Sequence, residues 1–481
     1  MKRNYLQLII LLCVSLVGCQ AQNRGRGPNS IDDSLMFVAV DTSYAFIRYD
    51  SNHLVLGPDS TAFRQLAKKW YRCLSTGEGH VNIVQIGASH VQGGTFPHRL
   101  RRNLLLGARS AVHVSNADVE GFPVSDRGML FPYSAAAKCN NPFDYRVTRS
   151  MPLALTRNVY KEPVESLGLC GIAVTAADTT ADIGIILNEP EIGFASTRIT
   201  LLGEARGGVV PRLLVRDADS LLTLLPQSSD SLLRRYHYEL PCPADSFHIV
   251  LPCTPGQSFA LTGVYLANDK PGITFHAIGV NGASVGDYLQ KCPYLTTDLQ
   301  LLQPDLVIFG IGINDASGPN FDSCAFRRRY LQLVDSIRSV SPGCAFLFIT
   351  NNDSARRIKR KRVTNTNGPL AREAFLRLGA ETGGAVWDQF SIMGGLGSMA
   401  KWQDAGLAQR DRVHFTRQGY ELLGDLLSNA LVATLQGFRP AQPAAHGLVP
   451  CAADSGKSRR QPDTRKVKKE STDERPNYIY Y

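Results

Sequence analysis

The sequence predicts an α/β protein whose parallel sheet is interrupted by an inserted β-domain. Strand-like apolar runs alternate with helical periodicity over residues 56–144 and again over 269–436, as expected for a chain that builds a parallel sheet. Between these segments, residues 145–268 hold short alternating runs separated by Gly, Pro, Asp and Ser. Such spacing is typical of a β-sandwich or jelly roll. The two α/β segments are therefore expected to rejoin in space around one sheet.

The first α/β segment begins with a helix. "TAFRQLAKKWYRCL" (61–74) has helical spacing, "VNIVQIG" (81–87) is predicted to be a strand, and "TFPHRLRRNLLLG" (95–107) a second helix. Residues 20–55 are expected to be a tether that leads into this segment.

Seven short runs of the insert are predicted to be strands, because apolar residues alternate in them and turn residues separate them. They are "GIAVTA", "ADIGIIL", "STRITLL", "RLLVRD", "HYELP", "FHIVLP" and "FALTGVYL".

The second α/β segment resumes after residue 269. "PDLVIFGIG" (304–312) is nearly all apolar, as a parallel strand buried on both faces should be. Residues 437–481 are rich in Pro and Ala and then in charge, which predicts a disordered basic tail. Further strands are expected at 273–280, 344–350 and 385–390, and helices at 285–292, 324–340, 368–383 and 416–435.

Length and composition indicate a globular protein with two domains. A chain of 481 residues exceeds what one core usually fills, and 44% hydrophobic with 20% charged residues is ordinary for this class. The net charge of +10 is concentrated in residues 355–362 and in the tail. Since no zinc-finger spacing or helix-turn-helix signature accompanies it, we expect no nucleic-acid partner. The basic segment 355–362 is typical of a solvated surface, and it also suits an acidic glycan.

The N-terminus predicts export. A charged "MKRN" precedes the apolar "YLQLIILLCVSLV", which is too short to remain as a membrane-spanning helix. The following "LVGCQ" resembles a bacterial lipobox, so residues 1–19 are interpreted as a lipoprotein signal peptide with lipidation at Cys19. Cleavage of an ordinary secretory signal near "CQAQ" is the alternative. We expect a membrane-anchored lipoprotein of the bacterial cell envelope, periplasmic or at the cell surface.

Cysteine usage gives limited information. Of eleven cysteines, Cys13 and Cys19 lie in the signal region, which leaves an odd number that cannot all pair. Cys242 and Cys253 can face each other across a hairpin in an oxidising compartment. No C-x-x-C or H-E-x-x-H occurs, so we expect neither a metal nor a cofactor.

Ser89, in "VNIVQIGASHVQGG" (81–94), is a candidate nucleophile that follows a strand and precedes a helix. A serine at such a place can also be a helix cap. A nucleophile needs a base and a group that orients the base. "DRVHFT" supplies Asp411 and His414 in a loop before the last helix, spaced so that the carboxylate can hold one imidazole nitrogen while the other faces the serine. "DSNH" (50–53) and "DSFH" (245–248) share this spacing but lie away from the carboxyl edge of the sheet, where such sites collect.

Two further residues follow predicted strands and can serve an oxyanion. Gly282 in "GVNGAS" permits a close approach of backbone N–H, and Asn314 in "FGIGINDA" offers an amide donor. Each is equally compatible with a turn. Four elements in the order Ser, Gly, Asn and Asp-His, each closing a predicted strand, favour a hydrolytic site.

The blocks "IGASH", "GVNGA", "GIND" and "DRVHF" resemble those of the SGNH (GDSL-type) hydrolases. "RGMLFPYSAAAKCNNP" and "MGGLGSMAKWQDAGLAQRDRVHFT" further resemble exported bacterial members, including peptidoglycan O-acetylesterases with an inserted β-domain. The resemblance implies a flavodoxin-like three-layer domain. It also implies Ser89 as nucleophile, His414 as base, Asp411 as its orienter, and Gly282, Asn314 and the Ser89 N–H as the oxyanion hole.

The resemblance further implies a carboxylic ester hydrolase that removes O-acetyl groups from peptidoglycan or another polysaccharide, with a carbohydrate-binding-like insert. The chain departs from the family at Ala88, where an Asp usually precedes the serine. A non-catalytic, lipid-anchored glycan-binding protein with a degenerate site is therefore the alternative. "GASVG" (282–286) also fits the G-x-S-x-G nucleophile elbow and makes Ser284 a competitor, although no HGGG-like loop lies upstream. Trp402, Phe415 and the basic segment are candidates for the rim of a sugar site.

Overall fold

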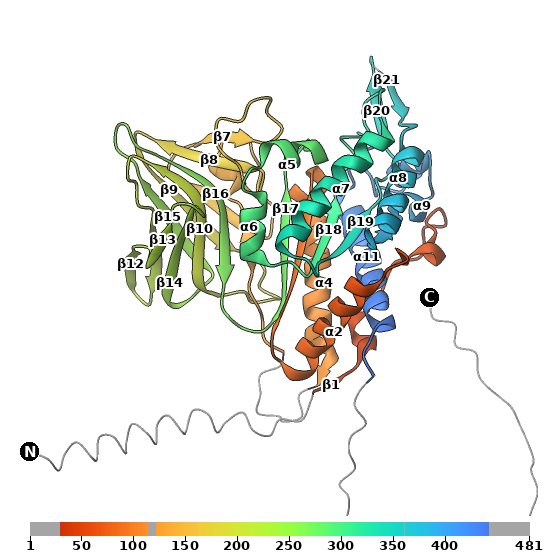
Figure 1. The fold of residues 1–481 in the computed structure, drawn as a ribbon, viewed down its shortest axis with the longest axis horizontal. Helices are drawn as coiled ribbons and strands as arrows, with labels where there is room; N and C mark the ends of the chain where they lie inside the picture. The colour runs from red at the N-terminus through yellow and green to blue at the C-terminus, as the bar shows by residue number, and fades with distance from the viewer. Residues whose placement is uncertain (1–28, 114–121, 360, 442–481) are drawn as a thin grey trace, which may run out of the picture. The chain divides into compact units, whose positions relative to one another are not determined.

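The computed structural model describes residues 29–113, 122–359 and 361–441. Its central sheet has the strand order β17-β3-β18-β19-β22-β2. Strands β17, β18 and β19 are labelled in Figure 1. All neighbours in this sheet are parallel except β2, which pairs antiparallel with β22 at one edge. The bounds of these strands are β17 (Gly272–Gly279), β3 (His80–Gly87), β18 (Leu306–Gly310), β19 (Ala345–Ile349), β22 (Ala385–Trp387) and β2 (Leu54–Leu56).

Helices cover both faces of this sheet, so the predicted three-layer α/β fold is confirmed. In β18, Val307 and Phe309 enter the core under one helical layer, whereas Leu306 and Ile308 enter the core under the other. Because successive side chains point to opposite faces, a strand that is buried on both faces needs apolar residues at every position. The first layer contains α5 (Val285–Lys291), α6 (Leu295–Leu302), α7 (Ser323–Val340) and α8 (Gly368–Thr382), and the second contains α2 (Thr61–Thr76), α4 (Thr95–Ala111) and α11 (Arg417–Gly437).

The insert consists of two antiparallel sheets, as predicted. One has the order β13-β14-β10-β16-β8-β7, with β5 also paired to β16, and the other has the order β12-β11-β15-β9-β6. The first sheet contains β13 (Ser228–Asp230), β14 (Arg235–Ala244), β10 (Ser196–Arg206), β16 (Ser258–Ala267), β8 (Ile172–Ala177), β7 (Ala154–Arg157) and β5 (Gly128–Leu130). The second contains β12 (Ser220–Leu224), β11 (Arg212–Asp217), β15 (Ser246–Pro252), β9 (Thr180–Leu187) and β6 (Tyr145–Arg149).

The insert and the α/β layers share one hydrophobic core. Leu261 and Val264 of β16 belong to the same buried cluster as Tyr288 of α5 and Leu299 of α6. Strand β5 precedes residue 145, yet it pairs with β16, so antiparallel pairing begins inside the segment assigned to the first α/β half. The insert is therefore packed into the α/β layers and is not a separate appendage.

Two expectations need correction, and two others lie wholly or largely outside the described residues. The described part of the expected tether is packed, since Met36 and Ile47 are buried and the segment ends in β2. Cys242 and Cys253 do not pair, because β14 and β15 lie in different sheets. Cys19 and most of the tail lie outside the described residues. No helix of the described chain is long and apolar enough to cross a membrane.

Candidate active site

Three neighbouring strands bring the predicted residues to one edge of the sheet. Gly87 of β3 lies in register with Gly279 of β17 on one side and with Gly310 of β18 on the other. Ser89 follows the central strand of these three, while Gly282 and Asn314 follow its two neighbours. The carboxyl ends of parallel strands are where ligand sites of open α/β sheets form.

Ser89, His414 and Asp411 form a continuous chain of hydrogen bonds. Nε2 of His414 lies 2.8 Å from Oγ of Ser89, and Nδ1 of His414 lies 2.7 Å from Oδ2 of Asp411. The other carboxylate oxygen of Asp411 accepts the backbone N–H groups of Val413 at 2.9 Å and His414 at 3.0 Å. Partial burial alone would raise the pKa of Asp411, but these bonds from His414 and Val413 lower it below its ordinary value. The carboxylate is thus kept ionised beside the imidazole.

The loop that carries the histidine is held at several points. The side-chain amide of Asn352 donates to Val413 O at 3.0 Å, and the backbone N–H of Gln409 donates to His414 O at 2.8 Å. Arg412 has a φ of 55°, a left-handed conformation that is uncommon for a residue with a side chain. Asn352 was not among the residues predicted from the sequence, although its place after β19, at the carboxyl edge of the sheet, was a usable signal.

Ser89 is not a helix cap. It is the first residue of α3 (Ser89–Gln92), whose N-cap is Ala88, and no side chain caps this helix. The turn is held by backbone bonds instead, since Ala88 O accepts from Val91 N at 3.1 Å and from Gln92 N at 2.9 Å. The hydroxyl of Tyr288 also donates to Gly87 O at 3.1 Å. The described structure therefore supports this turn without the aspartate that the family usually has at position 88.

The candidate oxyanion groups follow the two strands that flank the strand of the serine. Gly282 has a φ of 85°, a conformation that favours glycine. Asn314 donates one amide hydrogen to Ala283 O at 2.9 Å, which leaves its second amide hydrogen for a ligand. The backbone N–H groups of Ser89 and Gly282 donate no hydrogen bond to another described residue. Three donors are thus available at the ends of three adjacent strands.

Two residues that the sequence analysis missed fix the Gly282 loop. Gln92 of α3 accepts the N–H of Asn281 at 2.7 Å, which links this loop to the helix of the candidate nucleophile. Arg157 of β7 donates to the carbonyl oxygen of the same Asn281. The insert therefore contributes directly to the wall of the site, a long-range contact that no local sequence pattern signals.

His90 lies beside the imidazole of His414, with ring centroids 5.2 Å apart and the rings tilted by 40°. Its Nδ1 is 2.8 Å from the hydroxyl of Tyr420, and its Nε2 is buried without a described partner. Burial, followed by the charge of the nearby His414, lowers the pKa of His90 to about 3. His90 is therefore neutral at physiological pH and places no positive charge beside the base.

The other residues that the sequence offered for the nucleophile, the base or the rim of the site have different surroundings. Ser284 is the N-cap of α5 and forms a capping box with Asp287, with 2.7 Å between its Oγ and Oδ2 of that residue. His248 contacts Asp182, not Asp245. Trp402 and Phe415 do not line a rim, because both are buried in the core.

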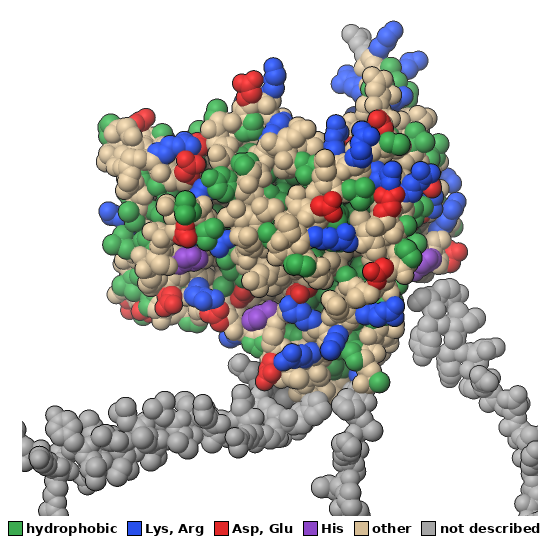
Figure 2. Space-filling model, in the orientation of Figure 1, with side chains coloured by type: hydrophobic (Ala, Val, Ile, Leu, Met, Phe, Trp, Pro, Cys, Tyr) green, Lys and Arg blue, Asp and Glu red, His purple; other side chains and the backbone are tan. Residues whose placement is uncertain are grey.

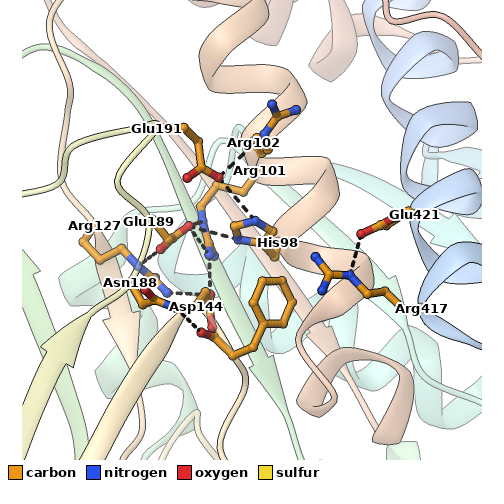
Figure 3. A network of polar contacts seen from close by, with 11 residues as sticks. His98, Arg101, Arg102, Arg127, Asp144, Asn188, Glu189, Glu191, Arg417 and Glu421 are labelled. Carbon is orange, nitrogen blue, oxygen red and sulfur yellow. Dashed lines mark hydrogen bonds and ion pairs between the residues drawn. The ribbon is translucent and has the colours of Figure 1, made fainter.

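A buried group with metal-ligand chemistry lies between α4 and the insert (Figure 3). It contains His98, Asp144 and Glu189, and two arginines already form ion pairs with the two carboxylates. Arg101 donates from Nε to Glu189 at 3.0 Å, and Arg127 donates to Asp144 at 2.8 Å. The arginines lower the pKa of Glu189 despite its burial. A metal ion would meet two fixed guanidinium charges here, so the group does not fit a metal site and is a charge-balanced ionic cluster.

The fold is consistent with an SGNH domain that carries an inserted β-domain. Residues 254–422 match the GDSL-like lipase/acylhydrolase family, so the family resemblance predicted from the sequence is confirmed. Members of this family are generally carboxylic ester hydrolases. No curated protein matches the sequence.

Solved structures resemble the chain to different extents. A peptidoglycan O-acetylesterase matches with a TM-score of 0.58 and 20% identity over 80% of this chain and 99% of its own. An acetyl xylan esterase matches with a TM-score of 0.27 and 16% identity over 32% of this chain and 79% of its own. A GDSL-like lipase from Bacteroides thetaiotaomicron matches with a TM-score of 0.26 and 14% identity over 33% and 75%. The first of these likenesses supports the fold, including the insert.

Proposed function

We propose that the protein hydrolyses carboxylic esters through a covalent acyl-enzyme on Ser89. The observation that carries this proposal is the hydrogen-bonded chain from Ser89 Oγ through His414 to Asp411. His414 Nε2 takes the hydroxyl proton while Oγ attacks the carbonyl carbon. The N–H groups of Ser89 and Gly282 and the amide of Asn314 stabilise the oxyanion.

His414 transfers one proton in each half of the reaction, acylation and deacylation. When the tetrahedral intermediate collapses, the bond to the alcohol oxygen breaks and His414 returns its proton to that oxygen. His414 then removes a proton from water, whose oxygen attacks the acyl carbon, and Ser89 leaves with the proton that His414 gives back. Asp411 holds the imidazole in the orientation that both halves need.

The proposed substrate is an O-acetylated polysaccharide, either peptidoglycan or another polymer. The fold likeness to a peptidoglycan O-acetylesterase supports this choice, as does the position of the insert beside the Gly282 loop. We also propose that the chain is exported and anchored to a membrane by lipid at Cys19, as the N-terminal sequence predicts.

Acetate release by the full chain tests this function. We expect turnover of a chromogenic acetate ester and acetate release from O-acetylated peptidoglycan or O-acetylated polysaccharides, both abolished in Ser89→Ala. Glycan binding without turnover of any ester would contradict the proposal and favour the non-catalytic alternative, to which the alanine at position 88 points.

A further inference from the structure

The hairpin β20 (Ala355–Ile358)–β21 (Lys361–Thr364) is a strongly basic projection. It leaves the carboxyl end of β19 and stands out beyond the helices, and Lys and Arg side chains gather on it (Figures 1 and 2). None of its exposed cations forms an ion pair with a residue that the structure describes. These exposed cations are Arg357, Lys359, Lys361 and Arg362.

The register of the hairpin places like charges together. Arg357 lies directly opposite Arg362 across the two strands. Like charges at directly opposed positions destabilise an antiparallel pair. The Nε of Arg357 donates to the backbone carbonyl of Lys359 at 3.2 Å, which neutralises neither guanidinium. Two adjacent guanidinium groups that have no acidic side chain as a partner in the described chain favour binding of a carboxylate or a similar anion of a ligand.

The hairpin is tied to the catalytic loop. The backbone N–H of Ala355 donates to Arg412 O at 2.8 Å, and Arg412 lies between Asp411 and His414 in the chain. Arg410, in the same loop, is exposed and forms no ion pair with a described residue. The basic hairpin is therefore attached to the loop that carries the base, and the exposed Arg410 lies two residues from the point of attachment.

We propose that this hairpin, together with Arg410, binds the carboxylate groups of an acidic polysaccharide and presents its esters to Ser89. The inference rests on the proposed function and names the substrate class for it. A nucleic acid fits less well, because residues 355–359 and 361–364 contain no aromatic side chain on which a base could stack. A membrane fits less well, because Ile358 is the only large apolar side chain exposed on the described part of the hairpin.

The test measures binding by the full chain carrying Ser89→Ala. The probes are O-acetylated polygalacturonate, which carries carboxylates, and O-acetylated glucomannan, which is neutral. We expect binding of the acidic polymer, weakened as salt screens the charges. Adding Arg357→Gln and Arg362→Gln should weaken this binding roughly threefold to thirtyfold, the effect of two exposed ion pairs. This variant should still fold, because it removes a repulsive pair.

Lys68→Gln with Arg72→Gln is the matched control, since both cations are exposed on α2. We expect this pair of substitutions to leave binding of the acidic polymer unchanged. Equal binding of both polymers, or equal effects of the hairpin and control substitutions, would overturn the proposal. Tighter binding of oligothymidylate or of phosphatidylglycerol vesicles than of the acidic polymer would also overturn it.

Failure of the proposed function is separable from failure of this inference. If the chain with Ser89 releases no acetate while Ser89→Ala binds the acidic polymer through the hairpin, the esterase proposal fails and the docking surface stands. If acetate is released equally well from acidic and neutral polymers and the hairpin substitutions change neither rate, the docking surface fails and the esterase proposal stands.

Discussion

Nε2 of His414 lies 2.8 Å from Oγ of Ser89, although 325 positions separate the two residues in the chain. The distance is within hydrogen-bonding range for proton transfer. Two loops at the carboxyl edge of the sheet create it, one after β3 and one before α11. The insert lies between these loops in sequence, and its packing against the α/β layers leaves the contact intact.

Ser89→Ala should lower kcat for a chromogenic acetate ester by on the order of 10³-fold or more, because it removes the atom that attacks the carbonyl. Ser284→Ala should remove only the cap of α5, with a loss of about 1 kcal/mol in stability. Steady-state kinetics and thermal unfolding of both variants measure the two effects. A larger loss of kcat in Ser284→Ala would reverse the assignment.

Asp411→Asn should lower kcat by roughly 10²- to 10⁴-fold, because an amide cannot hold the imidazole in the tautomer and charge state that the carboxylate favours. An asparagine keeps an oxygen to accept the N–H groups of Val413 and His414, so the melting temperature should change little. Kinetics combined with circular dichroism distinguish the two effects. A kcat within tenfold of the parent would argue against Asp411 as the orienter.

Asn314→Ala should reduce kcat by roughly 10²- to 10³-fold while KM changes little, because the amide is expected to act on the oxyanion more than on the ground state. The readout is the split between kcat and KM for a small acetate ester. A rise in KM alone would place Asn314 in substrate binding.

His90 should make the fold sensitive to acid. Its pKa is about 3 in the folded chain and about 6.5 when unfolded. Because the unfolded chain binds the proton first, stability is lost as the pH falls below 6.5. The loss between pH 7.5 and pH 5 is about 2 kcal/mol. His90→Asn retains a hydrogen-bond partner for Tyr420. In urea unfolding, the free energy of unfolding of this variant should fall by about 2 kcal/mol less between pH 7.5 and pH 5 than that of the parent. Equal losses in the two proteins would contradict a neutral His90.

Glu189→Gln should destabilise the protein by about 3–5 kcal/mol, because it leaves the buried Arg101 and Arg127 without one of their two carboxylates. Asp269→Asn, which breaks the exposed pair with Arg198, is the control and should cost less than about 1 kcal/mol. Chemical unfolding measures both changes. Similar small changes would mean that the buried cluster does not hold α4 to the insert.

The elements that follow hydrophobic periodicity were predictable from the sequence. The strand around Phe309 and the helix ending near Leu435 lie where their patterns predict, because burial on one or both faces sets the period. Asp388 is an exception. Its side chain accepts from Ser391 N at 3.2 Å and caps α9 (Gln389–Ile392), which begins where a strand was expected to continue.

The site was predictable only in part. Ser89, Gly282, Asn314 and the Asp411–His414 loop each close a strand or precede a helix, and parallel topology then brings them to one edge. Gln92 and Arg157 were not predictable, since their role depends on how α3 and the insert pack around the Gly282 loop. The prediction that Trp402 lies at the rim of a sugar site was wrong, because tertiary packing, which the local sequence does not show, buries its ring.

Mass spectrometry after reaction with a serine-directed fluorophosphonate shows whether Ser89 is the nucleophile. We expect a single adduct on the peptide that contains Ser89, lost in His414→Ala because the hydroxyl then has no base. An adduct on Ser284 instead, or no adduct on a chain that hydrolyses the chromogenic ester, would contradict this assignment.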